Sequence, residues 1–310
     1  MRSFLIALTS VCIFIQGPLK VLANPFFLPQ NLASRQSSTI KQSISFTVDC
    51  FRDFGPRILA FRFDVPGGNS AERCTALCHS HGYGLAGLEY GSECWCDNYM
   101  PYGQLMSDSD CSFTCPGDST ELCGAGNRMV VYQDSAATPP SPNICITWRD
   151  SSSFINNVLQ AIPKSGSGPV TKLYAIPTNP FTDPIYYTII STCPAGCPYT
   201  DYYNFGLYGN VIQSYNSVPY PPNVGDSQAF TSQSSVVGYA GFCPKPSPLS
   251  SNPFIGYPLL SVSGHTDLWS LCTNITAGGR QDIVYSPVAN HPHYTESACQ
   301  DVWIQMAPYS

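Results

Sequence analysis

Charged side chains are scarce in this sequence: only 11% of the 310 residues are Asp, Glu, Lys or Arg. The 14 basic residues are outnumbered by 20 acidic ones, and neither kind forms a block. Nucleic acids and anionic membranes bind through clustered Lys and Arg, so neither is expected as a partner. Beyond the N-terminal segment there is also no apolar run long enough to span a membrane. These absences favour neutral polar ligands.

Cysteine, proline, glycine and tyrosine are abundant instead. The chain holds 15 Cys, 28 Pro, 24 Gly and 19 Tyr, a composition typical of a loop-rich protein held together by disulfides. Residues 1–23 have the form of a secretory signal peptide, with Arg2 before a short apolar run and Ala23 at the expected cleavage site. Cleavage removes Cys12, one of the 15 cysteines, and leaves an even number for pairing. We therefore expect a secreted protein, extracellular or associated with the cell wall.

Cysteine density divides the rest of the chain. Residues 24–45 are polar without a periodic apolar pattern and are predicted to be a flexible lead-in. Residues 46–133 hold eight cysteines and residues 143–310 hold six, and the Pro-rich stretch 134–142 is predicted to be a linker between two domains. The cysteines expected to form disulfides are Cys50, Cys74, Cys78, Cys94, Cys96, Cys111, Cys115, Cys123, Cys145, Cys193, Cys197, Cys243, Cys272 and Cys299.

The first domain is predicted to be a small α+β fold. Asn69 can cap a helix, and Glu72 three residues later completes a capping box. Cys74 and Cys78 follow at a spacing of four, so both thiols lie on one helix face and can attach the helix to a sheet. Strand-like runs occupy residues 46–50, 85–90 and 129–132.

The second domain shows no sustained helical period. Short β-rich runs recur between clusters of Pro and Gly, as in an antiparallel sandwich or barrel. We therefore predict an all-β, sandwich-like domain with strands at residues 172–176, 185–191, 205–212, 234–242, 259–262, 268–273, 282–285 and 302–306.

The cysteine frame of residues 46–133 carries the most specific signal. Matching positions surround it at residues 50–53, 57–59, 71–78, 82–83, 86–96, 111, 115–117, 121, 123–124, 127–128 and 131–132. This pattern resembles the WSC domain, a module of fungal cell-wall stress sensors and of many secreted fungal carbohydrate-active proteins. Asp49, Asp97 and Ala125 stand where that family usually has Gly. The resemblance implies a PAN/apple-like fold that binds a cell-wall polysaccharide, β-glucan or a related glycan.

Aromatic and polar side chains alternate between residues 83 and 102. Sugar rings stack their apolar faces on aromatic side chains, while their hydroxyls need fixed donors and acceptors. Tyr99 and Tyr102, in the loop after Cys96, are expected to be exposed. For Tyr90 a place in the core of this small domain is favoured over exposure, and Trp95 can either pack inside or project. The residues predicted to bind glycan are Tyr90, Glu93, Trp95, Asp97, Asn98, Tyr99 and Tyr102.

No metal, cofactor or catalytic residue is predicted. His291 and His293 could face one ion with His265 or Glu296, but nothing fixes a third ligand, so a solvated loop is favoured. Glycoside hydrolysis needs two carboxylates at a set separation, and the sequence alone brings no pair together. The acidic candidates of the second domain are Asp150, Asp183, Asp201, Asp226, Asp267, Asp282, Glu296 and Asp301. Asn274 begins a sequon and is predicted to be glycosylated.

These patterns together predict a secreted, non-catalytic protein that binds cell-wall polysaccharide through residues 46–133. One alternative is a carbohydrate-active enzyme, in which the first domain targets a catalytic β-domain; convergent carboxylates in a cleft of residues 143–310 would favour it. A second alternative is a structural cell-wall protein, which retained self-association without polysaccharide binding would favour.

Overall fold

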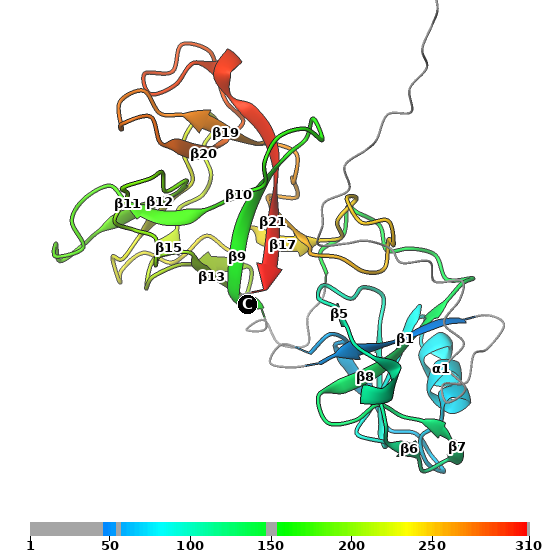
Figure 1. Cartoon of the computed structure of the whole chain (residues 1–310). Coiled ribbons are helices and arrows are strands. Elements are labelled where there is room, and N and C mark those ends of the chain that lie inside the picture. The colour runs from blue at the N-terminus through cyan, green and yellow to red at the C-terminus, as the bar shows by residue number, and fades with distance from the viewer. Residues whose placement is uncertain (1–45, 54–56, 147–153, 309–310) are drawn as a thin grey trace, which may run out of the picture. The chain divides into compact units, whose positions relative to one another are not determined.

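The computed structural model describes residues 46–53, 57–146 and 154–308 (Figure 1). The expected signal peptide and lead-in, residues 1–45, lie outside the described residues, and so does Asp150. The β-structure falls into two regions, residues 46–134 and 154–308, which are taken in turn.

The first region is an antiparallel sheet of six strands in the order β2-β4-β3-β8-β1-β5. β3 lies between β4 and β8, and all five of its residues are buried. The strands predicted near residues 46, 85 and 129 are present as β1, β3 and β8. The elements are β1 (Phe46–Arg52), β2 (Phe61–Phe63), β3 (Leu85–Glu89), β4 (Glu93–Asp97), β5 (Gln104–Leu105), the 3-10 turn η1 (Asp108–Asp110), the separate pair β6 (Thr114–Cys115) and β7 (Asp118–Leu122), and β8 (Arg128–Asp134).

The predicted helix is present as α1 (Ala71–Ser80), which packs against β3 and β4. Its N-cap is Ser70 and not Asn69, since Ser70 Oγ accepts a hydrogen bond from the Arg73 N–H at 3.3 Å. The Asn69 amide points the other way and donates to the carbonyl oxygens of Gly91 and Glu93. The expected cap is therefore wrong by one residue, because Asn69 serves to hold the β3–β4 turn.

Every cysteine among the described residues forms a disulfide, as the even count predicts. Cys74 and Cys78 share the buried face of α1 and bond to Cys94 and Cys96 of β4, so the helix is attached to the sheet at two points. In the first region the eight half-cystines form most of the buried cluster, which compensates for a small apolar core. The remaining bonds are Cys50–Cys111, Cys115–Cys123, Cys145–Cys243, Cys193–Cys197 and Cys272–Cys299.

The second region is all-β, as predicted, and its named strands pair antiparallel. The main path runs β14-β13-β9-β21-β19-β20-β12-β16-β15, with β10, β11, β17 and β18 joined at its sides. β9 and β21, the first and last strands, lie side by side (Figure 1). The sandwich arrangement stays an interpretation of this path.

The elements of the second region are β9 (Phe154–Pro163), β10 (Thr171–Lys172), β11 (Tyr174–Pro177), β12 (Tyr187–Ser191), β13 (Asn204–Tyr208), β14 (Val211–Gln213), β15 (Val218–Pro219), β16 (Ala229–Thr231), β17 (Phe242–Lys245), β18 (Leu259–Val262), β19 (Trp269–Thr273), β20 (Gln281–Tyr285), η2 (Glu296–Ala298) and β21 (Gln300–Pro308). Several expectations differ from them. The single strand predicted at 205–212 is a hairpin of β13 and β14, and the one predicted at 172–176 is divided between β10 and β11. The strand predicted at 234–242 is loop up to Phe242, where β17 begins, and β9 was not predicted.

Candidate functional site

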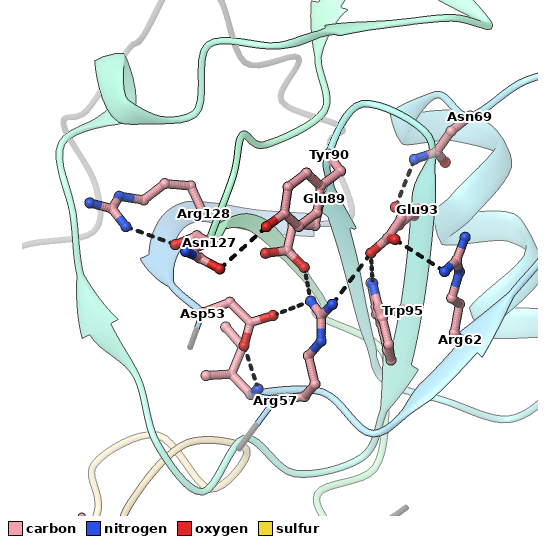
Figure 2. A network of polar contacts seen from close by, with 11 residues as sticks. Asp53, Arg57, Arg62, Asn69, Glu89, Tyr90, Glu93, Trp95, Asn127 and Arg128 are labelled. Carbon is pink, nitrogen blue, oxygen red and sulfur yellow. Dashed lines mark hydrogen bonds and ion pairs between the residues drawn. The ribbon is translucent and has the colours of Figure 1, made fainter. Parts of the chain in front are cut away.

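Arg57 is the centre of a polar cluster where β1, β3 and β4 end or begin (Figure 2). Its Nη1 lies 2.7 Å from Asp53 Oδ2 and also bonds Glu89, while its Nη2 lies 3.7 Å from Glu93 Oε2. Asp53 follows β1, Glu89 ends β3 and Glu93 begins β4, so the sheet brings three carboxylates to one guanidinium. A planar guanidinium with several fixed donors suits such convergent pairing.

Glu93 connects this cluster to Trp95 and Arg62. The Trp95 indole N–H donates to Glu93 Oε2 at 3.0 Å, and Arg62 Nη1 lies 3.1 Å from Glu93 Oε1. The Arg57 guanidinium lies over the Trp95 ring, 4.4 Å from its centroid, as a cation–π contact. Both oxygens of Glu93 are therefore held in place while its side chain keeps partial access to solvent.

Glu89 is the buried member of the cluster. Burial, and next the charge of Asp53, raises the pKa of the Glu89 carboxyl to about 8, against the opposing effect of Arg57. Near neutral pH the group therefore holds a proton for much of the time. The surface above Glu89 then carries the positive charge of Arg57 and the negative charge of Glu93, which largely balance.

Tyr90 projects from the turn between β3 and β4 and is 44% exposed. Its backbone has φ of 50°, a left-handed conformation that is uncommon for a bulky residue. The hydroxyl donates to Asn127 Oδ1 at 3.3 Å (Figure 2), and Gly126 leaves room beside the ring. The left-handed turn and the hydrogen bond to Asn127 thus hold the Tyr90 ring in place where it is exposed to solvent.

Phe113 is a second exposed aromatic side chain close to that turn. It is 46% exposed, and its N–H donates to the Gly124 carbonyl. A backbone hydrogen bond joins the turn between β3 and β4 to the segment after β7, because the Gly91 N–H donates to the Cys123 carbonyl at 2.9 Å. The Cys115–Cys123 disulfide closes the loop that carries this contact.

The predicted glycan-binding residues separate into two groups. Tyr90 and Glu93 lie together at the surface of the Arg57 cluster. Trp95 is 2% exposed and belongs to the core, which resolves the choice between packing and projection. Asp97 is buried as well, and Asn98 is half-buried, with its Oδ1 accepting a hydrogen bond from the Gly84 N–H.

The Asp97 carboxylate serves the backbone. Its oxygens accept hydrogen bonds from the N–H groups of Ala60, Asn98 and Tyr99. Burial raises the pKa of Asp97 to about 7, although those three hydrogen bonds oppose the shift. Asp97 therefore fixes the loop after β4 and has no oxygen directed at a ligand in solvent.

The expectation that Tyr99 and Tyr102 are exposed is wrong. They are 2% and 7% exposed, respectively. The Tyr99 hydroxyl donates to the Gly256 carbonyl at 2.9 Å, and the Tyr102 hydroxyl donates to Asn157 Oδ1 at 2.7 Å. Both partners are far away in sequence, so no local pattern could reveal them.

Three surface residues of the site were not predicted: Arg57, Phe113 and Asn127. Arg57 had an available signal, because it belongs to the family-like pattern at residues 57–59, in a stretch that also holds Asp53, Glu89 and Glu93. Phe113 had a weaker signal: it lies between Cys111 and Cys115, in a short segment with a cysteine at each end. Asn127 was part of the family-like pattern, yet its role depends on the pairing of distant loops.

Among the acidic candidates of the second region, Asp226 and Asp282 line one cavity, together with His291 and His293. Asn274 lines it too, and its Nδ2 donates to Asp282; glycosylation of Asn274 stays a prediction. Within the described residues, the one group of three metal-ligating side chains is Cys74, Cys78 and Cys94, and all three are engaged in disulfides. No helix in the described part of the chain is long and apolar enough to cross a membrane.

Residues 47–125 match the family model of the WSC domain. A WSC domain-containing protein of Arthroderma benhamiae is 38% identical over 101 residues, which cover 29% of this chain and 10% of that protein. The xylosyltransferase oxt of Drosophila melanogaster is 31% identical over 132 residues, which cover 39% of this chain and 15% of that protein. A putative fungistatic metabolite of Chaetomium globosum is 44% identical over 71 residues, which cover 21% of this chain and 32% of that protein.

The chain thus spans a third or less of the length of each of these relatives. They are proteins of different kinds from a fungus, a fly and another fungus, as expected for a module that occurs in many contexts. The family model covers the cysteine frame, the Arg57 cluster and Tyr90, and the second region lies outside it. Residues 47–125 are a WSC domain.

Proposed function

We propose that this protein acts outside the cell and binds polysaccharide, β-glucan or a related glycan, through its WSC domain without modifying it. The WSC domain points to carbohydrate binding. Its disulfide-rich structure suits an extracellular location, where such bonds persist. The observation that carries the proposal is the exposed Tyr90 ring, fixed beside the Arg57 cluster.

Tyr90 supplies the stacking surface. A sugar ring presents an apolar C–H face that packs on an aromatic face, and Tyr90 is held so that little side-chain freedom remains to be lost on binding. Phe113, exposed near the same turn, extends the aromatic surface toward a further sugar unit. A polymer that lies across both rings gains contacts along its length.

Arg57, Glu93 and Asn127 supply the polar contacts. A sugar hydroxyl can donate to the Glu93 carboxylate and accept from the Arg57 guanidinium. Because Glu93 is already bonded to Trp95 and Arg62, it is oriented before the ligand arrives. Pre-organisation of this kind lowers the entropic penalty of binding.

The test is co-sedimentation of the oxidised full chain with insoluble β-1,3-glucan, chitin, cellulose and xylan. We expect Tyr90→Ala to weaken binding about tenfold, whereas Tyr90→Phe, which keeps the ring, retains most of it. Leu105→Ala, an exposed apolar position on β5 of the same domain, is the control for loss of apolar surface. Binding of Tyr90→Ala equal to that of the wild type would refute the proposed site.

An enzymatic role for the second region has one specific observation in its favour, since Asp226 and Asp282 line the same cavity. Asp282, however, accepts hydrogen bonds from Ser191, Asn274 and Arg280, so it is occupied in holding its neighbours. Sugar release, measured in the same tubes, distinguishes this alternative: release that Asp226→Asn abolishes would establish an enzyme. Self-association without polysaccharide binding would point to a structural protein of the cell wall.

A further inference from the structure

The second region holds a cavity of about 440 Å³, formed by residues outside the WSC domain. Its apolar lining includes Ile189 of β12, Ala229 of β16 and Tyr220. Its polar lining includes Asp226, Asn274, Arg280, Asp282, His291 and His293. The size is in the range of small-ligand sites, which combine an apolar surface with a few placed polar groups.

A chain of hydrogen bonds across the polar lining fixes the proton of His293. The Asp282 carboxylate is 2% exposed and can only accept, so the group of Asn274 that lies 2.7 Å from its Oδ2 is the amide Nδ2. Asn274 Oδ1 then accepts from the Thr276 hydroxyl at 2.9 Å. With that proton used, the contact of 2.9 Å between Thr276 Oγ1 and His293 Nδ1 requires the hydrogen to be on Nδ1.

In its neutral form, the His293 imidazole therefore offers a lone pair at Nε2, as an acceptor. His291 shows the opposite arrangement. Its Nδ1 accepts the backbone N–H of His293 at 3.3 Å, so its hydrogen is on Nε2, 3.8 Å from Asp226 Oδ1. Stacking on the buried Tyr294 ring, with 4.3 Å between centroids, holds His291 in that orientation.

The cavity thus presents acceptors and donors side by side. His293 Nε2 and the Asp226 carboxylate accept, while His291 Nε2 and the Arg280 guanidinium donate. A hydroxyl group donates and accepts at once, so several hydroxyls on one ligand match this alternation. A ligand of one charge sign matches it poorly, because an anion meets two Asp carboxylates and a cation meets Arg280.

We propose that this cavity binds a neutral, polyhydroxylated ligand, a mono- or disaccharide unit, independently of the WSC domain. The ligand's hydroxyls bond the histidine pair and Asp226, and its C–H face packs on Tyr220. Thr276 and Asp282 also line the cavity, and their role in this proposal is to position His293: Thr276 bonds it directly, and Asp282 acts through Asn274 and Thr276. The site gives the chain a second carbohydrate contact of a different kind, a pocket for a short unit and not a surface for a polymer.

The experiment titrates cellobiose, laminaribiose, N,N′-diacetylchitobiose and xylobiose into the full chain by calorimetry, with inorganic phosphate and Zn²⁺ as charged probes. We expect at least one disaccharide to bind. Asp226→Asn and His293→Ala should each raise its Kd about fivefold to tenfold, the loss of one ligand hydrogen bond. Asp267→Asn and His265→Ala are matched controls, because Asp267 is as exposed as Asp226 and also pairs with a histidine.

Thr276→Val tests the positioning chain, because it removes the hydroxyl while keeping the shape. We expect nitrogen-detected NMR to show the His293 hydrogen on Nδ1 in the wild type and mixed between Nδ1 and Nε2 in Thr276→Val. The disaccharide Kd should rise in parallel. An unchanged tautomer in Thr276→Val would contradict the positioning chain.

The Tyr90→Ala variant distinguishes the cavity proposal from the WSC proposal, because it should weaken polysaccharide binding and leave disaccharide binding unchanged. Failure of the polysaccharide assay with intact disaccharide binding would overturn only the WSC proposal. The cavity proposal is overturned if none of the four disaccharides binds, if Tyr90→Ala abolishes their binding, or if phosphate or Zn²⁺ binds through Asp226 or His293. The proposal requires Asn274 to be unmodified and so replaces the glycosylation expected from its sequon: a glycan found on Asn274 by intact mass would overturn the proposal, because its first sugar would occupy the space that Asn274 lines.

Discussion

The indole N–H of Trp95 donates to Glu93 from inside the sheet, across 3.0 Å, while the ring is 2% exposed. Trp95 thus supports the binding surface and is not part of it. A tryptophan between two cystines would otherwise be an attractive stacking residue. Its position assigns the aromatic contact to Tyr90, on the turn that Trp95 and the disulfides hold rigid.

Trp95→Ala should therefore act on stability. Removing a buried aromatic side chain leaves a cavity and takes one hydrogen-bond donor away from Glu93, so we expect the free energy of unfolding to fall by about 3–5 kcal/mol. Tyr90→Ala, at an exposed position, should change it by less than about 1 kcal/mol. Urea denaturation followed by circular dichroism measures both, and similar losses for the two variants would contradict this assignment.

Glu89 should make stability fall as pH rises. Its pKa is about 8 in the folded protein and near 4.5 in a free side chain, so across that range the folded state keeps a proton that the unfolded chain has released. Raising pH from about 4.5 to 8 then favours unfolding, by a few kcal/mol at most, since each pKa unit corresponds to about 1.4 kcal/mol.

Glu89→Gln removes this contribution, so its stability should depend less on pH over that range than that of the wild type. Asp97, whose pKa is raised to about 7, contributes with the same sign and leaves a residual slope. Glu72→Gln, on the exposed side of α1, is the control and should follow the wild type. Parallel curves for Glu89→Gln and the wild type in thermal melts from pH 4 to 9 would disprove the buried proton.

Disulfide removal should rank by the length of chain that each bond closes. Cys50–Cys111 spans 61 residues and Cys193–Cys197 spans 4. In the chain-entropy treatment these separations correspond to about 4 and about 2 kcal/mol of stabilisation. Paired Cys→Ser variants compared by denaturant midpoint test the ranking, and a larger loss for the short loop would reverse it.

Asp282→Ala should be strongly destabilising. The carboxylate is buried against Arg280 Nε at 2.9 Å, and its removal leaves that charge without its partner, a loss of about 3–5 kcal/mol. Asp226→Ala, an exposed carboxylate of the same cavity, should lie within about 0.5 kcal/mol of the wild type. Equal effects in chemical denaturation would place Asp282 outside the structural framework of the cavity wall.

Covalent and local features of the fold were predictable from the sequence. The spacing of Cys74 and Cys78 sets one helix face, and that face meets β4 through both bonds. Strand β9 was missed even though, at ten residues, it is the longest of the strands that the structure describes. The run predicted at 234–242 is loop up to Phe242, and within it Gly238 lies so close to Val211 and Val218 that a side chain there would collide.

The candidate site was predictable only in part, because exposure depends on contacts between distant residues. Tyr99 has the same local setting that an exposed loop tyrosine has, and its burial follows from bonds to Gly256 and Ser247. Arg57 gains its role from Asp53, Glu89 and Glu93, which meet only once β1, β3 and β4 have joined one sheet, with β8 between β3 and β1. The sequence pattern reveals residue types and their spacing, whereas the site is formed only where these side chains come together in the folded domain.

The cystines that flank Trp95 have a consequence for oxidative folding. Cys78 Sγ lies 4.0 Å from Cys94 Sγ, although Cys78 is bonded to Cys96. Sliding β4 by two residues would keep its faces unchanged and bring one of its two cysteines opposite the wrong partner on α1. Nearness alone therefore does not select the native pairing; the register of β4 against β3 does. A chain oxidised before that hairpin forms has two nearly equivalent ways to close, and a disulfide isomerase would be needed to return it to the native one.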